Sequence, residues 1–417
     1  MRRTSRRETV DRARIHGDEA VTHESPAYLL RGSVVTPSGV LDDGVVAVRD
    51  GTITAVGPAA RFACHELPPA CDSTLLPGLV DIHCHGGGGF GFPDADRDRC
   101  EEIVRFHRSR GTTTQLASLV SAPPADLEHQ IHELAPLVDG GEIAGIHIEG
   151  PFLSADNCGA QNPRHIADGD PGLLRHLLRT AGGRIKVMTV APETPHFADL
   201  ARLLSRHGAV ASIGHTGAGF AQVMAAVDAT AASLLSGSAP HVSFTHLFNG
   251  MAPFHHRAPG AAGAALTLAV QGRAIVELIA DGTHIADETV SMVFALLGAD
   301  RIALVSDAMP ATGMPDGGYQ LGSMHVTVAD GVARLTTTEG ATASLAGSTS
   351  TMIDVLRRSV LESGVDIVQA TLSAATTPAR FLGLRDRGAL KAGLRADILE
   401  LTPDLRISNV VRGGVSC

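Results

Sequence analysis

Residues 79–85 read LVDIHCH, a short apolar run that ends in two histidines. Seven further strand-like runs follow, separated by amphipathic stretches such as LARLLSRHG. They are TTTQLAS (112–118), IAGIHIEG (143–150), KVMTVAPE (186–193), AVASIGH (209–215), VSFTHLFN (242–249), AIVELIAD (274–281) and RIALVSDA (301–308). Eight strands that alternate with helices predict an α/β fold, a (β/α)8 TIM-like barrel over residues 78–387. A doubly wound open sheet is the alternative, but no GxGxxG or GxxxxGK[ST] motif follows a strand.

The two ends of the chain differ from this middle part. Residues 1–25 are charged and aperiodic, which predicts a disordered tail. LLRGSVVTPSG, GVVAVRDG and TITAVG near the start, and GLRADILELTP and ISNVVRGG near the end, are short β-branched segments split by Gly, Asp or Pro. We therefore expect a small β-sandwich domain built from both chain ends, residues 26–77 and 388–417.

The composition excludes several classes of protein. A net charge of −10 argues against a broad basic surface for nucleic acid, although it leaves room for a local positive pocket. The N-terminal arginines precede no apolar segment of a signal peptide, and no run of about 18 apolar residues predicts a membrane span. The six cysteines fit neither a disulfide scaffold nor a zinc finger. We expect a cytoplasmic protein that acts on a small molecule.

Polar side chains collect at the carboxyl ends of five predicted strands. They are His83 and His85 (first strand), Glu149 (third), His215 (fifth), His246 (sixth) and Asp307 (eighth). In a barrel these ends meet at one face, where active sites are built. Because side chains alternate along a strand, His83 and His85 should both point into the barrel mouth and Cys84 toward the helices. Histidines and carboxylates together suit Zn²⁺, Fe²⁺ or Mn²⁺.

Each of these residues also has a structural explanation. A single histidine at a strand end is more often hydrogen-bonded than metal-bound, and the chain has 20 histidines. Asp307 could cap a helix, and Glu149 could cap the turn at Gly150-Pro151. Four histidines and two carboxylates at the same end of the strands nevertheless favour a metal centre. Such a centre predicts hydrolysis of an amide, ester or similar bond, with Asp307 taking a proton from a metal-activated water.

Longer motifs resemble the amidohydrolase superfamily, and within it the N-acetylglucosamine-6-phosphate deacetylases. The resemblance runs from about Leu30 to Gly414. Its motifs include LLPGLVDIHCHGGGG (75–89), GIHIEGPFLS (145–154), GHTGAG (214–219), THLFNGMAPFHHRAPG (245–260), ELIADGTHI (277–285) and LVSDAMPATG (304–313). It implies metal-dependent hydrolysis of the acetamide of N-acetyl-D-glucosamine 6-phosphate to glucosamine 6-phosphate and acetate, in amino-sugar catabolism or recycling.

The resemblance also implies a role for each matching residue. Glu149, His215 and His246 match the core metal ligands, His83 and His85 match a pair that adds a second ion, and Asp307 matches the general acid/base. The substrate-binding positions are Gln161, Asn249, Gly250, Arg257 and His284. One or two divalent ions are expected, with Zn²⁺ first and Fe²⁺ or Mn²⁺ as alternatives. Arg257 is expected to reach the neighbouring subunit's site, which implies a homodimer.

One position departs from the family. The family commonly has a histidine where this chain has Gln161, and glutamine can donate a hydrogen bond but cannot carry a positive charge.

Three alternatives stay open beside this interpretation. Dihydroorotases and hydantoinases bridge their metals with a carboxylated lysine at the end of the fourth strand, but here Lys186 begins that strand. A deacetylase for N-acetylgalactosamine 6-phosphate is a closer alternative, because the two sugars differ at one hydroxyl that no motif reads. A non-catalytic sugar-phosphate sensor would be expected to lose Asp307 or the ligands.

Overall fold

The middle of the chain forms the predicted barrel. The computed structural model describes residues 28–64, 67–231, 242–336 and 343–417, so the tail predicted at 1–25 lies outside the described residues. All eight predicted strands lie in one parallel sheet in the order β14-β13-β12-β11-β10-β9-β8-β5, which confirms the α/β barrel class. They are β5 (Leu79–Asp81), β8 (Thr112–Leu119), β9 (Gly145–Glu149), β10 (Ile185–Val190), β11 (Val210–Ile213), β12 (Val242–Phe244), β13 (Ala274–Leu278) and β14 (Ile302–Leu304).

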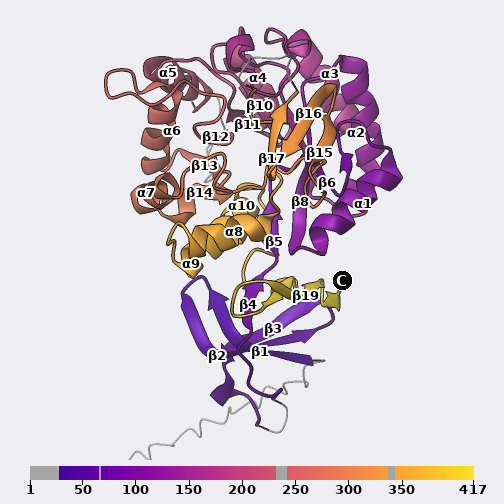
Figure 1. Cartoon of the computed structure of the whole chain (residues 1–417), viewed down its shortest axis with the longest axis vertical. Coiled ribbons are helices and arrows are strands. Elements are labelled where there is room, and N and C mark those ends of the chain that lie inside the picture. Colours follow the sequence, from indigo (N-terminus) through magenta and orange to yellow (C-terminus); the bar gives the residue numbers. More distant parts are fainter. Residues whose placement is uncertain (1–27, 65–66, 232–241, 337–342) are drawn as a thin grey trace, which may run out of the picture.

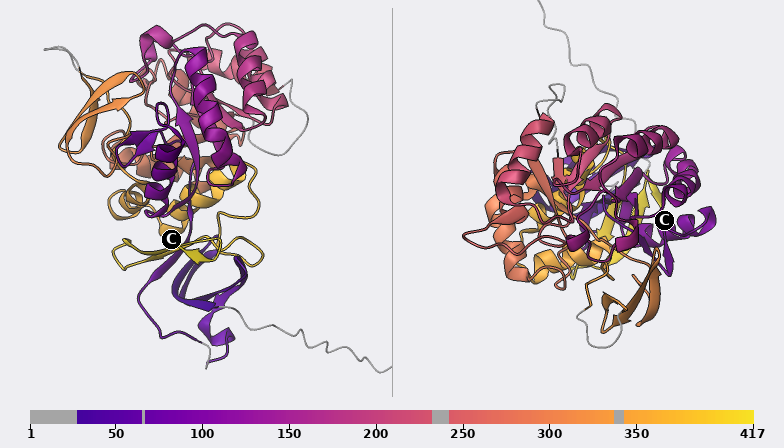
Figure 2. Two further views of the ribbon diagram at one scale, coloured as in Figure 1. Left: turned by 90° about the vertical axis from the view of Figure 1, so that its right-hand side faces the viewer. Right: turned by 90° about the horizontal axis from the view of Figure 1, so that it is seen from above.

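A helix follows each barrel strand and packs on the outside of the sheet. Seen from above, these helices form a ring around the strands (Figure 2). They are α1 (Arg97–Arg108), α2 (Pro124–Asp139), α3 (Pro171–Ala181), α4 (Phe197–Arg206), α5 (Phe220–Ala231), α6 (Gly260–Val270), α7 (Asp287–Leu297) and α8 (Met352–Leu361). The helices thus cover one face of every strand, while the other face lines the barrel interior.

Strand β9 shows how the sequence serves both faces. All five of its residues are buried. Ile146 and Ile148 join the apolar core that includes Leu134 of α2 and Leu174 of α3. His147 and Glu149 instead point into the barrel, where His147 contacts Thr189 of β10 and Glu149 contacts His215, which follows β11.

Local sequence also fixes where the helices begin and end. At the start of α3 the Asp170 carboxylate accepts hydrogen bonds from the backbone N–H groups of Gly172 and Leu173, at 2.7 and 3.2 Å. Pro171 occupies the first helical position, where no N–H is needed. Gly182 ends the helix with φ 54°, a left-handed conformation that glycine adopts at little cost.

The barrel closes between its first and last strands just beyond their regular parts. Cys84 and Ala308 form a parallel bridge. The N–H of His85 donates to the Ala308 carbonyl at 2.8 Å, and the N–H of Asp307 donates to the His83 carbonyl at 2.9 Å. The Cys84 side chain lies on the α1 side, with its sulfur 3.4 Å from His107 Nε2, so its predicted outward direction is confirmed.

Strands from both chain ends form a second sheet below the barrel, as Figure 1 shows. Its order is β20-β19-β18-β4-β1-β2-β3, and it has a hydrophobic core of its own around Val34, Ile53 and Ile398. The strands are β1 (Tyr28–Thr36), β2 (Gly39–Arg49), β3 (Thr52–Pro58), β4 (Thr74–Pro77), β18 (Ile398–Leu401), β19 (Ile407–Arg412) and β20 (Val415–Ser416). The domain limits drawn from the sequence stay a prediction. Helices α8, α9 (Ile367–Thr371) and α10 (Thr377–Phe381) lie between this sheet and the barrel (Figure 1).

Two short antiparallel sheets lie near the mouth of the barrel. One pairs β6 (Gly86–Gly87) with β7 (Phe90–Gly91) directly after the two histidines of the first strand. The other joins β15 (Gly317–Leu321), β16 (Met324–Ala329) and β17 (Val332–Leu335), and it stands out from the side of the barrel (Figure 2, left). The eight-strand pattern in the sequence did not predict this insertion.

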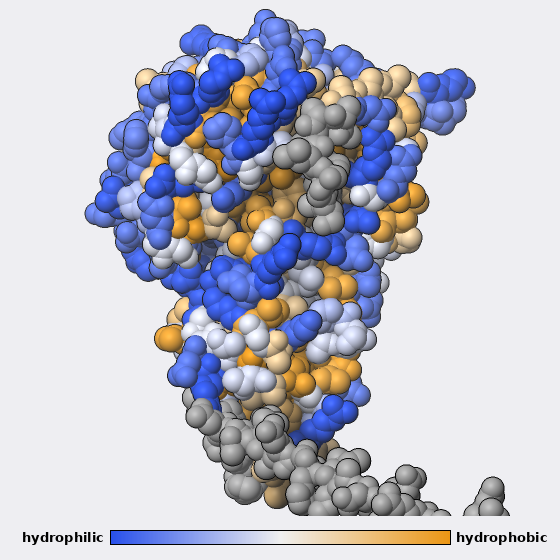
Figure 3. Space-filling model, turned by 180° about the vertical axis from the view of Figure 1, so that it is seen from behind, coloured by the Kyte–Doolittle hydropathy of each residue, from blue (hydrophilic) through white to orange (hydrophobic). Residues whose placement is uncertain are grey.

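The surface is mixed in character. Figure 3 shows mainly hydrophilic residues over the back of the barrel, broken by small hydrophobic patches. Within the described residues, no helix combines the length and the apolar character that a membrane crossing needs.

Asp397 links the end sheet to the barrel, and its replacement tests how much this link contributes to stability. Its buried carboxylate accepts hydrogen bonds from the Thr113 hydroxyl on β8 (3.1 Å), the Gly413 N–H (2.9 Å) and Arg395 Nε (2.8 Å). Asp397→Ala leaves the Arg395 guanidinium without its carboxylate partner, so we expect a loss of about 3–5 kcal/mol in the free energy of unfolding, measured by urea denaturation. Asp404→Ala, at an exposed carboxylate paired with Arg406, is the control and should leave the unfolding midpoint unchanged. Equal effects of the two substitutions would contradict the assigned link.

Candidate metal centre

The polar residues predicted from the strand ends converge at the mouth of the barrel. Glu149 is the last residue of β9, whereas the histidines and Asp307 follow the ends of their strands by two to four residues. All six are buried: His83, His85, Glu149, His215, His246 and Asp307. The sequence therefore identified a set of residues that the structure brings together.

His83, His85 and Glu149 form one group whose ligand atoms lie within 4.8 Å of one another. The Nε2 atoms of the two histidines are 3.1 Å apart. His85 Nε2 lies 3.2 Å from Glu149 Oε2, and His83 Nε2 lies 3.6 Å from Glu149 Oε1. Three such donors around one point are what a divalent cation of borderline softness requires.

Glu149, His215 and His246 form a second group of the same kind. Glu149 Oε1 is 3.0 Å from the Nε2 atom of each histidine, and these two nitrogens are 3.1 Å apart. Glu149 therefore belongs to both groups and would contribute a ligand to a metal ion held by either one. Burial alone would raise the pKa of this carboxyl, but the imidazoles of His83 and His215 hold it well below its ordinary value.

The outer nitrogens of three histidines fix which ring atom faces the centre. Each Nδ1 lies against an acceptor that cannot donate, so it carries the proton and leaves the Nε2 lone pair for a metal. The contacts are His83 Nδ1 to Glu277 Oε2 (3.0 Å), His85 Nδ1 to the Ser118 carbonyl (3.2 Å) and His215 Nδ1 to the Asn157 carbonyl (3.0 Å). The donor set and its orientation thus fit one or two divalent ions.

Asp307 borders the first group. Its Oδ1 lies 3.4 Å from the Nε2 atoms of both His83 and His85. Asp307, His215 and His246 have φ values of 46°, 48° and 29°, in the left-handed region that residues other than glycine rarely adopt. Such strain persists only where surrounding contacts hold it, and it gathers at functional sites.

A cavity of about 380 Å³ opens directly over these residues. Gln161, Asn249, Gly250 and His284, all predicted to bind substrate, line it. Gly250 has φ 62°, and a Cβ atom there would lie 2.9 Å from His215 Nδ1, so only glycine lets the backbone approach the ligand this closely. Arg257, the fifth predicted substrate-binding residue, is exposed and does not line the cavity of its own chain.

Gln161 contacts Glu149 and the Ser121 backbone rather than standing free in the cavity. Its amide nitrogen donates to Glu149 Oε2 at 2.6 Å, and its amide oxygen accepts from the Ser121 N–H at 2.7 Å. The side chain is buried, with both ends engaged. Gln161 therefore orients the Glu149 carboxylate.

His284 is held by a buried carboxylate that the sequence analysis did not single out. His284 Nδ1 lies 2.8 Å from Asp281 Oδ2, and both side chains are about 95% buried. Burial by itself would raise the pKa of Asp281, but the hydrogen bond and charge of His284 lower it to about 2. The same pairing outweighs burial at His284 and raises the pKa of that imidazole, which favours a cation at the edge of the cavity.

Glu277 is a second residue that was missed. It is fully buried on β13, and its Oε2 accepts from His83 Nδ1 and, at 3.2 Å, from the His246 N–H. A charged residue inside the apolar run AIVELIAD was the signal that could have found it. Lys186 lies elsewhere: its ammonium donates to the Gly183 carbonyl at the start of β10, so it offers no carboxylated bridge.

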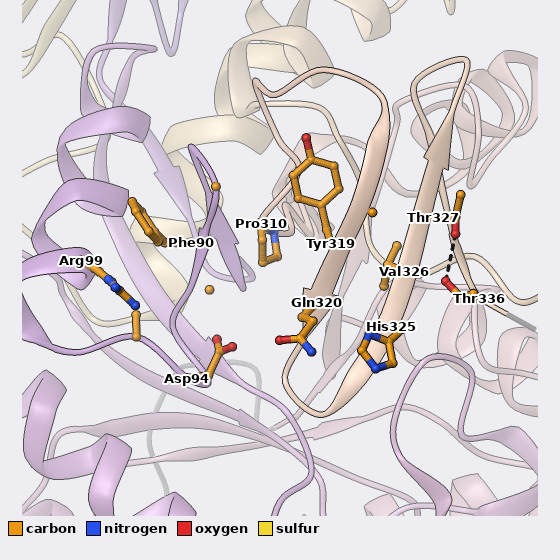
Figure 4. Close-up of a pocket in the computed structure, with 14 residues that line it drawn as sticks. Phe90, Asp94, Arg99, Pro310, Tyr319, Gln320, His325, Val326, Thr327 and Thr336 are labelled. Atoms are coloured by element: carbon orange, nitrogen blue, oxygen red, sulfur yellow. Dashed lines mark hydrogen bonds between the residues drawn. The ribbon is translucent and has the colours of Figure 1, made fainter.

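A larger hollow, about 680 Å³, lies between β7, α1 and the β15–β16 hairpin (Figure 4). Phe90, Asp94 and Arg99 face Tyr319 and His325 across it. None of the grouped histidines and carboxylates lines this hollow. Convergent ionisable groups mark a reactive site better than volume does, so the smaller cavity is the candidate active site.

Known proteins resemble this chain over most of its length. The amidohydrolase family model matches residues 74–417. An N-acetylglucosamine-6-phosphate deacetylase of Bacillus subtilis is 34% identical and covers 92% of this chain and 95% of its own length. An N-acetylgalactosamine-6-phosphate deacetylase of Escherichia coli O157:H7 is 32% identical over 90% of this chain and 95% of its own.

A solved structure agrees with these relatives. The N-acetyl-D-glucosamine-6-phosphate deacetylase from Mycobacterium smegmatis is 38% identical, with a TM-score of 0.85 over 93% of this chain and 99% of that one. The chain therefore belongs to the amidohydrolase family of hydrolytic enzymes, and within it to the N-acetylglucosamine-6-phosphate deacetylases.

Proposed function

We propose that this enzyme hydrolyses the acetamide of N-acetyl-D-glucosamine 6-phosphate, releasing acetate and glucosamine 6-phosphate in amino-sugar catabolism. The observation that carries the proposal is Glu149, shared by two histidine pairs, with Asp307 beside them at the floor of a cavity. Two relatives that match this chain over 92% and 88% of its length carry this activity in their names.

Asp307 acts as the general acid and base in the proposed reaction. Divalent ions held by the grouped histidines and Glu149 would supply an activated water and polarise the scissile carbonyl. The Asp307 carboxylate accepts a proton from that water and passes it to the amine that leaves. Gln161 keeps Glu149 in place through its 2.6 Å hydrogen bond.

The other predicted residues bind the sugar phosphate. His284 lies at the edge of the cavity, where Asp281 raises the pKa of its imidazole and so favours the cationic form, and it contacts the phosphate dianion. Asn249 and the backbone of Gly250 contact the sugar from the loop after β12. We propose Zn²⁺ as the metal, because imidazole and carboxylate ligands suit it, with Fe²⁺ and Mn²⁺ as alternatives.

We further propose that the enzyme is a homodimer and that Arg257 completes the partner's phosphate site. An apolar hollow of about 570 Å³ adjoins the active site, and His284 lines both. Phe254, Met292 and Leu296 around this hollow are 56%, 51% and 52% exposed, and a second subunit would cover these side chains.

The six cysteines are free thiols, which suit the reducing cytoplasm, and we propose the cytoplasm as the compartment.

A deacetylase for N-acetylgalactosamine 6-phosphate is the second candidate, favoured by the 32% identical relative of that name. Acetate release from the two 6-phosphates, measured side by side, tests the function. We expect the higher kcat/KM on the glucosamine derivative. A reversed preference would favour the second candidate, and metal-loaded protein that cleaves neither sugar phosphate would contradict both.

Two substitutions separate the proton-transferring group from the metal-binding one. Asp307→Asn removes the base but none of the grouped ligands, so we expect kcat to fall about 10²- to 10⁴-fold with bound metal unchanged. Glu149→Gln weakens both ligand groups, so metal and activity should be lost together. Metal content by plasma mass spectrometry, beside acetate release, checks both expectations. Full activity of Asp307→Asn would rule out its assigned role.

A complementation experiment tests whether Arg257 acts across subunits. Arg257→Ala should raise KM about 10- to 100-fold, because a charge-assisted hydrogen bond to phosphate is lost. When Arg257→Ala and Asp307→Asn chains are coexpressed, mixed dimers contain one site with an intact Asp307 and the partner's intact arginine. At substrate concentrations well below the raised KM of Arg257→Ala, we expect such mixtures to be more active than either variant alone. Arg206→Ala, at an exposed arginine on α4, is the control; no recovery in mixed dimers would place Arg257 outside the partner's site.

A further inference from the structure

Ser348 lies between the two loops that carry the anion-binding and proton-transferring residues. It is 2% exposed and lies close to the N-terminus of α8, after the β15–β17 insertion. One neighbouring loop follows β14 and carries Asp307, and the other follows β13 and carries Asp281 and His284. Neither the family motifs nor the ligand groups assign a function to its hydroxyl.

The backbone of Ser348 fixes the Asp307 loop. Its N–H donates to the Asp307 carbonyl at 2.8 Å, and its own carbonyl accepts from the Met309 N–H at 3.0 Å. Ser348 and Ala308 form a parallel bridge, which adds a further strand segment beside the closure of the barrel. Asp307 has a disfavoured φ of 46°, and these hydrogen bonds hold its backbone in that conformation.

The side chain of Ser348 points to the other loop. Its hydroxyl donates to Asp281 Oδ2 at 2.8 Å, the same oxygen that lies 2.8 Å from His284 Nδ1. The second oxygen of Asp281 accepts from the N–H groups of Thr283 and His284, both at 2.8 Å. The Ser350 N–H donates to the Ser348 hydroxyl at 3.0 Å, which holds that oxygen in one direction.

We propose that Ser348 is a positioning residue that couples the His284 anion site to Asp307. The proposal rests on the function given above, because it needs a phosphate on His284 and a proton transfer at Asp307. Phosphate binding at His284 shifts the position of Asp281, which is hydrogen-bonded to the Ser348 hydroxyl. Because the N–H of the same serine donates to the Asp307 carbonyl, the shift alters the position of Asp307. Binding energy from a remote part of the substrate thereby improves the geometry of the reacting centre.

Coupling through Ser348 and a purely structural role for this serine predict different effects on kcat. If Ser348 only stabilises the fold, removing its hydroxyl lowers the melting temperature and affects kcat equally whether or not His284 is present. If Ser348 acts through His284, the same removal matters only while the imidazole is there. A double-substitution cycle measures this difference directly.

The experiment uses the metal-loaded enzyme and N-acetylglucosamine 6-phosphate, with Ser348→Ala, His284→Ala and the double variant. We expect Ser348→Ala to lower kcat about tenfold in the parent enzyme and less than about twofold beside His284→Ala. Bound metal stays the same in all variants. Asp281→Asn, which keeps the shape but removes the charge, should likewise abolish the effect of Ser348→Ala.

Thr349→Ala is the matched control, since it removes a hydroxyl from the next residue, where it donates to the Gly331 carbonyl away from the site. It should leave kcat unchanged. Equal effects of Ser348→Ala with and without His284, or a loss of kcat matched by Thr349→Ala, would overturn the coupling. An unsubstituted enzyme that releases no acetate would instead count against the proposed function.

Discussion

The hydrogen bonds that close the barrel between its first and last strands also bring together the residues of the candidate metal centre. His85 donates to the Ala308 carbonyl, and Asp307 donates to the His83 carbonyl, so the closing strands bring their side chains to within 3.4 Å of one another. Without this closure, the first histidine pair and the Asp307 carboxylate would lie at opposite edges of an open sheet. Closure of the barrel and the geometry of the site therefore depend on the same hydrogen bonds.

A second constraint is the cost of burying so many polar groups. Below the metal centre, His147 contacts the Ser118 hydroxyl (2.9 Å) and the Thr189 hydroxyl (2.8 Å), and Thr189 continues to Thr245 at 2.8 Å. Burial lowers the pKa of His147 well below its ordinary value, so this imidazole stays neutral while both its nitrogens are satisfied. His147 of β9 thus finds partners on β8 and β10, and Thr245 after β12 extends this network beneath the candidate metal centre.

The residues around the centre divide by how they act. Glu277 and the Ser118 carbonyl set the orientation of the first histidine pair, and Gln161 sets that of the shared carboxylate. The Gln161 amide donates to Glu149 and accepts from the Ser121 N–H. These two hydrogen bonds give a structural role to the glutamine that stands where the family commonly has a histidine. The neutral Gln161 side chain supports Glu149, whereas the imidazole at the cavity edge whose pKa is raised belongs to His284.

Much of the architecture could be predicted because strand and helix leave different periods in a sequence. The eight apolar runs, the two strand-rich ends and the period-two spacing of His83 and His85 all follow from local chemistry. The conjunction of His, Glu and Asp at strand ends was likewise visible, because parallel strands place all their carboxyl ends at one face. The family motifs added the roles of these residues but not their distances.

Tertiary structure alone decided the rest. The sequence could not show that Glu149 lies between two histidine pairs, that Glu277 and Asp281 support His83 and His284, or that Ser348 joins two loops. These contacts link residues many positions apart, and their formation depends on how strands register when the barrel closes. The position of Arg257 outside the cavity of its own chain was also not predictable, because it depends on how the loop that carries Arg257 folds over the surface. Local sequence thus determined which elements form and which residues could react, whereas long-range packing determined which of them meet.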